Sequence, residues 1–151
     1  FIYPLNNLTK KSFYKLFLKI NKTQRPIEKK IISLGREVIF KETINDAVFT
    51  DFNFICSYKF SPNDYIKVTD RFKIFFIDNI PLLGRNKLNE IKRFIILIDI
   101  LYENKSNIFL RAENDLFNIF DLKKSEVPYK RTVSRISEMT SAEWNLNKRR
   151  T

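Results

Sequence analysis

The C-terminal region contains two arginines whose spacing suits the binding of an anion. Arg131 and Arg135 lie four residues apart in a periodic segment, residues 130–140, which predicts a helix that Pro128 precedes. Two like charges at this spacing share one helix face and destabilise an isolated helix by about 0.2–0.5 kcal/mol. We therefore expect an anion to offset the repulsion. Glu138 is the candidate within the helix, and a phosphate or a carboxylate from another element is the alternative.

A second position that could do chemistry is Asp78, which follows the apolar residues Phe75, Phe76 and Ile77. A strand that ends in an acid can hold Mg²⁺ beside the phosphates of a nucleotide. The carboxylate that would act as the base falls at the next position, where this chain has Asn79, and an amide cannot take up a proton as a carboxylate does. We therefore predict that Asp78 caps a turn at the end of a strand.

The third candidate is Asp99, which lies within the most strongly periodic segment of the chain, residues 86–103. The pattern predicts a helix with one wide apolar face. Asp99 lies beside that face, near Ile95 and Tyr102. We expect it to accept a hydrogen bond from a neighbouring backbone or hydroxyl group, which is a structural role rather than a catalytic one.

The composition removes most other kinds of catalytic or metal site. The 151 residues include no His, a single Cys, Cys56, and two Gly, Gly35 and Gly84. Without His there is no imidazole for a nucleophilic dyad, and one Cys cannot build a zinc site or an internal disulfide. Two glycines so far apart cannot form a phosphate-binding or a dinucleotide-binding loop. We therefore predict no catalytic residue, no metal site and no enzyme activity of this chain alone.

The net charge of +11 raises an alternative function, a non-catalytic module that binds nucleic acid or an acidic protein. The excess lies at the ends, because residues 1–60 carry +6, residues 61–120 carry +1 and residues 121–151 carry +4. The chain is also rich in Ile, Asn and Phe, a bias that A+T-rich codons produce together with lysine. We interpret most lysines as solvated surface, and nucleic acid as the less favoured partner.

Periodicity and turn residues predict an α/β fold of short elements. Thr9 can cap an amphipathic helix that ends near Asn21, and Gly35 joins the two strands of a β-hairpin. A strand, the long helix and a further strand form a βαβ crossover, which implies a parallel pair. The expected strands are 29–34, 37–43, 47–50, 73–77 and 107–110, and the other expected helices are 52–56, 62–70, 115–120 and 130–140.

We expect a single domain that is the C-terminal part of a longer protein, because the first residue is Phe rather than Met. No apolar run approaches the about 20 residues of a membrane span. The expected parts are an opening segment with an amphipathic helix, 1–26, a hairpin with a third strand, 27–50, an α/β unit, 51–128, and a C-terminal helix with a basic tail, 129–151.

Short segments in order along the chain carry a resemblance to one protein family. They are Tyr3-Pro4, Leu34-Gly35-Arg36, Phe52 with Ile55-Cys56, Asp64-Tyr65, Phe72 to Ile80-Pro81, Arg93-Phe94-Ile95 with Leu97-Ile98-Asp99 and Leu101-Tyr102, Ala112-Glu113, and Arg131-Thr132-x-Ser134-Arg135-Ile136-x-Glu138-Met139-x-Ser141-x-Glu143-Trp144. Together they resemble the C-terminal part of the cell division protein ZapE family and its relatives, the mitochondrial lactation-elevated ATPases. The chain departs from the family pattern at Lys92, Arg111 and Trp144, where the family has Arg, Ser and Tyr.

The resemblance implies part of an AAA-type P-loop ATPase fold. It also implies, for the intact protein, ATP hydrolysis with ATP and Mg²⁺, a role in bacterial cell division in the cytoplasm, and a division-ring protein as partner. Further copies of the same chain are a second expected partner. The resemblance places the family's phosphate loop, Mg²⁺ strand and arginine finger upstream of the matched region, so the chain itself is expected to bind neither cofactor. In this setting we expect Arg131 and Arg135 to contact nucleotide phosphates or a neighbouring subunit, with Asp99 and Glu138 in structural pairing.

Overall fold

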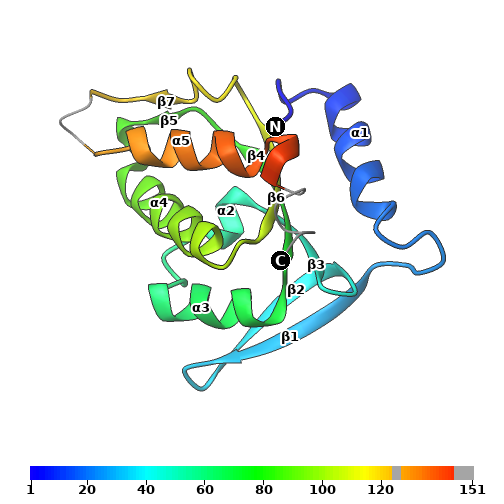
Figure 1. Ribbon diagram of the computed structural model, residues 1–151. Helices are drawn as coiled ribbons and strands as arrows, with labels where there is room; N and C mark the ends of the chain where they lie inside the picture. The colour runs from blue at the N-terminus through cyan, green and yellow to red at the C-terminus, as the bar shows by residue number, and fades with distance from the viewer. Residues whose placement is uncertain (124–126, 145–151) are drawn as a thin grey trace.

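The chain forms a mixed α/β fold around one five-stranded sheet (Figure 1). The computed structural model describes residues 1–123 and 127–144. The strand order is β1-β2-β3-β4-β6, in which β1, β2 and β3 pair antiparallel and β3, β4 and β6 pair parallel. The strands are β1 (Ile27–Ser33), β2 (Arg36–Ile44), β3 (Ala47–Asp51), β4 (Ile74–Ile80) and β6 (Asn107–Ala112).

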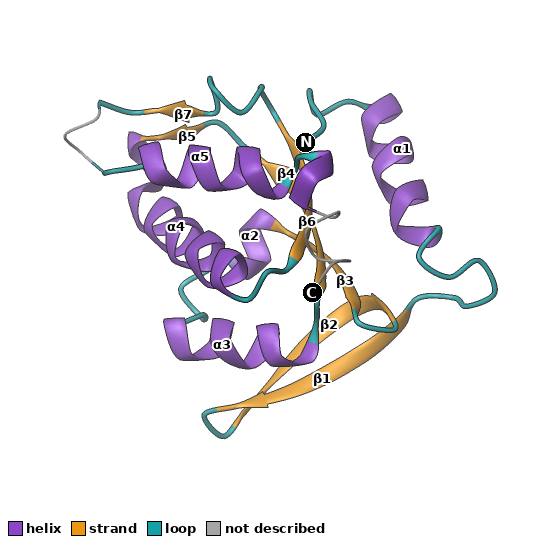
Figure 2. Ribbon diagram, viewed as in Figure 1, coloured by secondary structure: helices purple, strands orange, loops and turns teal. Residues whose placement is uncertain are grey.

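The predicted hairpin is confirmed, and the end that carries its turn lies beside α3 (Figure 2). Its turn contains Leu34 and Gly35, whose φ angles are 52° and 76°. Glycine adopts this left-handed region without steric cost. The third strand, β3, is confirmed as well, with Ile44 paired to Ala47 across the next turn.

The predicted βαβ crossover is also present. The helix α4 (Leu88–Glu103) connects β4 to β6, and these strands pair in parallel, with Ile74 opposite Asn107. A short 3-10 helix, η1 (Arg85–Lys87), precedes α4, so the α-helix begins two residues later than the sequence pattern predicts.

Three shorter helices begin at or near the positions where the sequence predicted helices to start. The helix α2 (Phe52–Ile55) is capped by Asp51, whose side chain accepts a hydrogen bond from the Phe54 amide at 2.9 Å. The helix α3 (Pro62–Arg71) has Pro62 at its first position, and α5 (Lys130–Met139) follows Pro128 as expected.

The first helix, α1 (Asn7–Leu18), begins earlier than predicted because Asn6 rather than Thr9 is its cap. The Thr9 amide donates to Asn6 Oδ1 at 2.9 Å, and the Asn6 amide donates to Thr9 Oγ1 at 3.2 Å. This reciprocal arrangement is a capping box, and Asn is among the strongest N-cap residues.

The helix predicted at residues 115–120 is wrong. The Asp115 carboxylate accepts hydrogen bonds from the amides of Phe117 and Asn118 at 2.9 and 3.1 Å and folds this segment into a turn. The chain then enters β7 (Phe120–Asp121), which pairs in parallel with β5 (Leu83–Gly84). The predicted basic tail, residues 145–151, lies outside the described residues.

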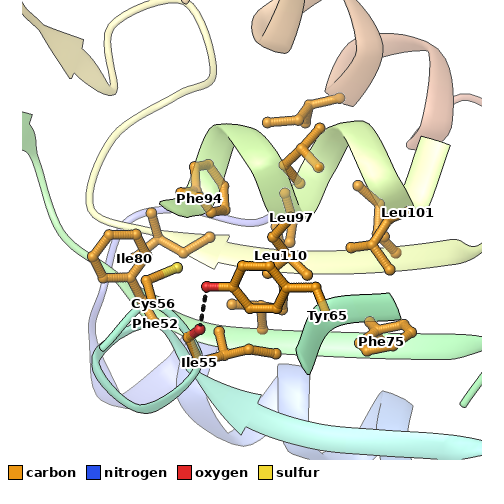
Figure 3. Close-up of a cluster of buried hydrophobic side chains, with 14 of the residues drawn as sticks. Phe52, Ile55, Cys56, Tyr65, Phe75, Ile80, Phe94, Leu97, Leu101 and Leu110 are labelled. Carbon is orange, nitrogen blue, oxygen red and sulfur yellow. Dashed lines mark hydrogen bonds between the residues drawn. The ribbon is translucent and has the colours of Figure 1, made fainter. Parts of the chain in front are cut away.

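Hydrophobic cores lie on both faces of the sheet. On one face α1 packs Phe13 and Phe17 against Phe76 and partly buried neighbours. The other face carries α2, α3 and α4, with α5 packed on α4 (Figure 1). Within this larger core Tyr65 is completely buried, and its hydroxyl donates to the Ile55 carbonyl at 2.7 Å (Figure 3).

Candidate functional site

The two arginines of α5 meet a carboxylate of α4. Asp99 accepts a hydrogen bond from Arg131 Nη2 at 2.9 Å and another from Arg135 Nη1 at 2.6 Å. The anion that offsets the arginine repulsion therefore comes from another element, which was the alternative that the sequence left open. Asp99 binds these two guanidinium groups rather than the backbone or hydroxyl group expected from the sequence. We call Asp99, Arg131 and Arg135 the arginine cluster.

Glu138 is not the partner of Arg135 that the sequence predicted. It accepts a hydrogen bond from the Tyr102 hydroxyl at 2.8 Å, and this bond raises the pKa of Tyr102. In the described part of the chain the carboxylates that pair with Arg135 are those of Asp99 and, at 3.7 Å, Glu103. The Glu138 carboxylate lies within hydrogen-bond reach of the Tyr102 hydroxyl on α4, and Arg135 pairs with carboxylates of α4 instead.

Arg135 is further held by an aromatic stack. Its guanidinium carbon lies 4.5 Å from the centroid of the Tyr102 ring, and Tyr102 stacks on Trp144 with centroids 5.4 Å apart. The Trp144 indole N–H donates to the Ser106 carbonyl at 2.9 Å. These contacts fix the end of α5 against α4 and β6.

The two arginines differ in exposure. The side chain of Arg135 is 20% exposed, whereas that of Arg131 is 67% exposed and makes one hydrogen bond to Asp99. A guanidinium group has five N–H donors, so Arg131 keeps donors for an external anion. The arrangement can present a positioned cation at the surface of α5.

A second ion pair is almost completely buried. Arg111 Nε and Asp78 Oδ1 are 2.5 Å apart, and both residues are at most 4% exposed. Arg111 also donates to the Asn79 side chain at 3.0 Å, to Thr9 Oγ1 at 3.2 Å and to the Asn6 carbonyl at 3.4 Å. The pair therefore links β4, β6 and the start of α1. We call it the buried pair.

The sequence missed Arg111 as a partner. Asp78 does accept a hydrogen bond from the following amide, Asn79, at 2.7 Å, as a capping residue would, but its charge is balanced by Arg111. The available signal was the acid itself, because an acid in an apolar strand is seldom buried without a cation. Arg111 stood out only as a departure from the family pattern.

A third charged group attaches the hairpin to α3. Asp64 accepts hydrogen bonds from the Ser33 hydroxyl, from Arg36 Nη2 at 2.8 Å and from the Ser61 amide at 2.7 Å. Burial alone would raise the pKa of Asp64, but the bonds from Ser33, Ser61 and Arg36 lower it below its usual value.

A pocket of about 300 Å³ lies near the carboxyl ends of β3 and β4. Ligands of α/β sheets often bind at such edges. Here the three lining carboxylates already have partners within the chain, since Asp51 caps α2, Glu42 accepts from the Tyr14 hydroxyl at 2.5 Å, and Asp78 binds Arg111. Burial, followed by the bond to Glu42, raises the pKa of Tyr14 to about 12. These three carboxylates therefore have structural roles.

Residues 1–123 and 127–144 contain no group of three or more His, Cys, Asp or Glu side chains placed to hold a metal ion. None of the helices described is long and apolar enough to cross a membrane. Cys56 is completely buried, and burial raises the pKa of its thiol, which makes it a poor nucleophile. The arginine cluster is thus the strongest candidate for a functional site.

Comparison with known proteins agrees with the class suggested by the sequence motifs. A family model for the AFG1-like ATPases matches residues 1–148. The chain belongs to the AFG1-like ATPase family. It is 26% identical over 141 residues to the cell division protein ZapE of Escherichia coli K12, a match that covers 93% of this chain and 38% of that protein.

Two eukaryotic relatives share nearly the same sequence identity with this chain. An uncharacterized protein of Schizosaccharomyces pombe is 27% identical over 84% of this chain and 28% of its own length. The lactation elevated protein 1 homolog B of Danio rerio is 26% identical over 72% of this chain and 21% of its own length. The chain therefore spans less than two fifths of these relatives. No solved structure matches it.

Proposed function

We propose that this chain is the C-terminal part of an AAA-type P-loop ATPase that hydrolyses ATP with Mg²⁺ in the bacterial cytoplasm and acts in cell division. The observation that carries the proposal is the family match over residues 1–148. The name of the Escherichia coli relative supports a role in cell division. The division-ring protein that we propose as partner is what the family resemblance implies. In this proposal a preceding part of the protein supplies the phosphate loop, because the two distant glycines of this chain cannot form one.

The fold is compatible with this role. In P-loop proteins the nucleotide lies at the carboxyl ends of parallel strands that are connected by helices. We propose that β3, β4 and β6, with the crossover helix α4, are the part of such a fold that this chain contributes. Residues 1–151 then act as one C-terminal domain of the larger ATPase.

Within the domain we assign different roles to the two arginines. Arg131 contacts nucleotide phosphates or a neighbouring subunit, because its exposed guanidinium makes only one hydrogen bond to Asp99. Arg135 is a positioning residue, because Asp99, Glu103 and the Tyr102 ring surround it. Asp99 orients both guanidinium groups and keeps α5 on α4.

Binding of a fluorescent ATP analogue tests the proposal. We expect the 151-residue chain alone to show no saturable binding, because it contains no phosphate loop. The longer protein should bind the analogue in a Mg²⁺-dependent manner and should hydrolyse ATP. Saturable binding by the chain alone, or a longer reading frame without Gly-x-x-x-x-Gly-Lys-Ser/Thr upstream, would contradict the proposal.

A further inference from the structure

The exposed face of α1 carries a stripe of lysines. Lys11, Lys15 and Lys19 recur every four residues on the side of the helix that faces away from Phe13 and Phe17. Successive lysines are therefore about 6 Å apart along the helix axis. All three are exposed, and no other described helix lies beside α1 in Figure 1. We call these three residues the lysine stripe.

Within the residues that the structure describes, no ion pair balances the charge around the stripe. Residues 1–27 contain six Lys or Arg and no Asp or Glu, so they carry more than half of the net charge of +11. In the described part of the chain, no Lys or Arg of residues 1–27 forms an ion pair. The segment is therefore an uncompensated cationic surface.

The local structure accounts for only part of this charge. Lys15 and Lys19 lie near the carboxyl end of α1, where the helix dipole favours cations. Lys10 and Lys11 lie toward the amino-terminal end, where the dipole disfavours them, and Lys11 also repels Lys15 across one turn. Folding of this chain alone gives no reason for this arrangement.

One exposed leucine lies on the same face and another at its edge. Leu8 is 76% exposed and continues the stripe toward the start of the helix, whereas Leu16 is 36% exposed and lies at the edge of the stripe, three residues before Lys19. The face thus combines regularly spaced positive charge with apolar contact points. Interfaces between proteins use this combination, in which apolar contacts supply binding energy and charges supply orientation.

We propose that the lysine stripe, with Leu8 and Leu16, docks an acidic amphipathic segment of a partner protein. A partner helix with carboxylates at every fourth residue would repeat its charges at the same spacing of about 6 Å. This inference concerns a surface remote from the arginine cluster and does not depend on the ATPase role proposed above.

The observations favour a protein over a lipid surface. An amphipathic helix that lies on a membrane inserts its apolar face among the lipids. In α1 that face is already occupied, because Phe13 and Phe17 are completely buried against the sheet. Leu8 and Leu16 alone offer too little apolar area for insertion.

The observations also favour a protein over single-stranded nucleic acid. Proteins that bind single strands place exposed aromatic rings beside their cations so that bases can stack. The aromatic residues of α1 are not available, since Phe13 and Phe17 are buried and Tyr14 is half-buried with its hydroxyl bound to Glu42. Exposed leucines on a cationic face suit a peptide better than a phosphate backbone.

Fluorescence anisotropy with the 151-residue chain tests the proposal. The probe is a labelled helical peptide that carries glutamates four residues apart with leucines between them. We expect Lys11→Gln, Lys15→Gln and Lys19→Gln together to weaken its binding by about tenfold or more, since three surface ion pairs are lost. Leu8→Ala should weaken binding of the peptide further, and circular dichroism should show that each variant keeps its helix content.

The matched control is Lys59→Gln, Lys67→Gln and Lys92→Gln, which removes the same charge from exposed lysines elsewhere. We expect this control to bind the peptide within about threefold of the parent chain, because distant surface charges are screened by salt. An equal loss in the control would overturn the proposal. Tighter binding to single-stranded DNA or to phosphatidylserine vesicles than to the peptide would overturn it as well.

Discussion

The buried pair and the arginine cluster use the same chemistry in opposite surroundings. Arg111 and Asp78 are enclosed between β4, β6 and the start of α1, whereas Arg131 is mostly exposed on α5. A charge in the interior has lost its hydration and depends on its partner, but an exposed charge keeps much of its hydration. The buried ion pair therefore maintains the fold, while the exposed arginine keeps N–H donors for a ligand.

The largest expected effect is loss of Arg111. Arg111→Met leaves Asp78 as a buried charge without its cation, so the free energy of unfolding should fall by about 3–5 kcal/mol. Urea denaturation followed by circular dichroism measures this loss. The double variant Asp78→Leu with Arg111→Met should regain much of the stability, and a double variant as unstable as the single one would contradict the assignment.

Asp64 should show an intermediate effect, because it is buried but lies at the edge where the hairpin meets α3. Asp64→Asn weakens hydrogen bonds to a charged group, and we expect a loss of about 1.5–3 kcal/mol. The same urea titration measures it. Arg36→Ala removes only one of these bonds, so it should cost less than Asp64→Asn, and the reverse order would contradict this interpretation.

The lowered pKa of Asp64 also leads us to expect that stability depends on pH. Its pKa is lowered in the folded state, so the folded state holds the proton less strongly than the unfolded chain. The stabilisation is therefore complete above the unfolded pKa of about 3.9 and is lost as the pH falls through the lower folded pKa. Unfolding curves collected from neutral to acid pH should show this loss, and in Asp64→Asn it should be smaller.

Asp99 should matter less for stability than Asp78. Asp99→Asn removes the charge that pairs with both arginines, but water can partly solvate the guanidinium groups at this partly exposed site. We expect a loss of about 1 kcal/mol, measured by urea denaturation. A loss as large as that of Arg111→Met would show that the arginine cluster is a second structural pair.

The smallest effect on stability is expected for Arg131→Ala. An exposed ion pair contributes about 0–1 kcal/mol, so the melting temperature should move by no more than a few degrees. Differential scanning calorimetry provides the measurement. Arg135→Ala serves as the comparison within the cluster and should cost more, since it also removes the contact with Tyr102.

The sequence predicted the parts of the fold that depend on local patterns. Periodicity located α4 and the hairpin, and Pro128 marked the approach to α5. The turn at Asp115 was missed because its side chain competes for amide protons, an effect that periodicity does not report. The ion pairs were missed for a different reason. Arg111 is paired with Asp78 by strand order and register, and neither can be read from the spacing of the two residues.

The arginine cluster illustrates the same limit. Spacing on α5 correctly indicated that an anion must face Arg131 and Arg135, and left two sources open. Only the packing of α5 on α4 brings Asp99 between the two guanidinium groups and gives Glu138 to Tyr102. The difference in exposure between the two arginines is likewise a property of packing, and it is the basis for assigning them different roles.

We propose that the exposed Arg131 acts in the ATPase reaction of the longer protein, while the buried pair maintains the fold. The most direct test is the steady-state ATP turnover of the longer protein with Arg131→Ala, compared with Lys130→Ala, which changes the exposed neighbouring residue. We predict that Arg131→Ala lowers turnover by at least about tenfold with an unchanged melting temperature, and that Lys130→Ala keeps full turnover. Equal turnover in the two folded variants would contradict the account.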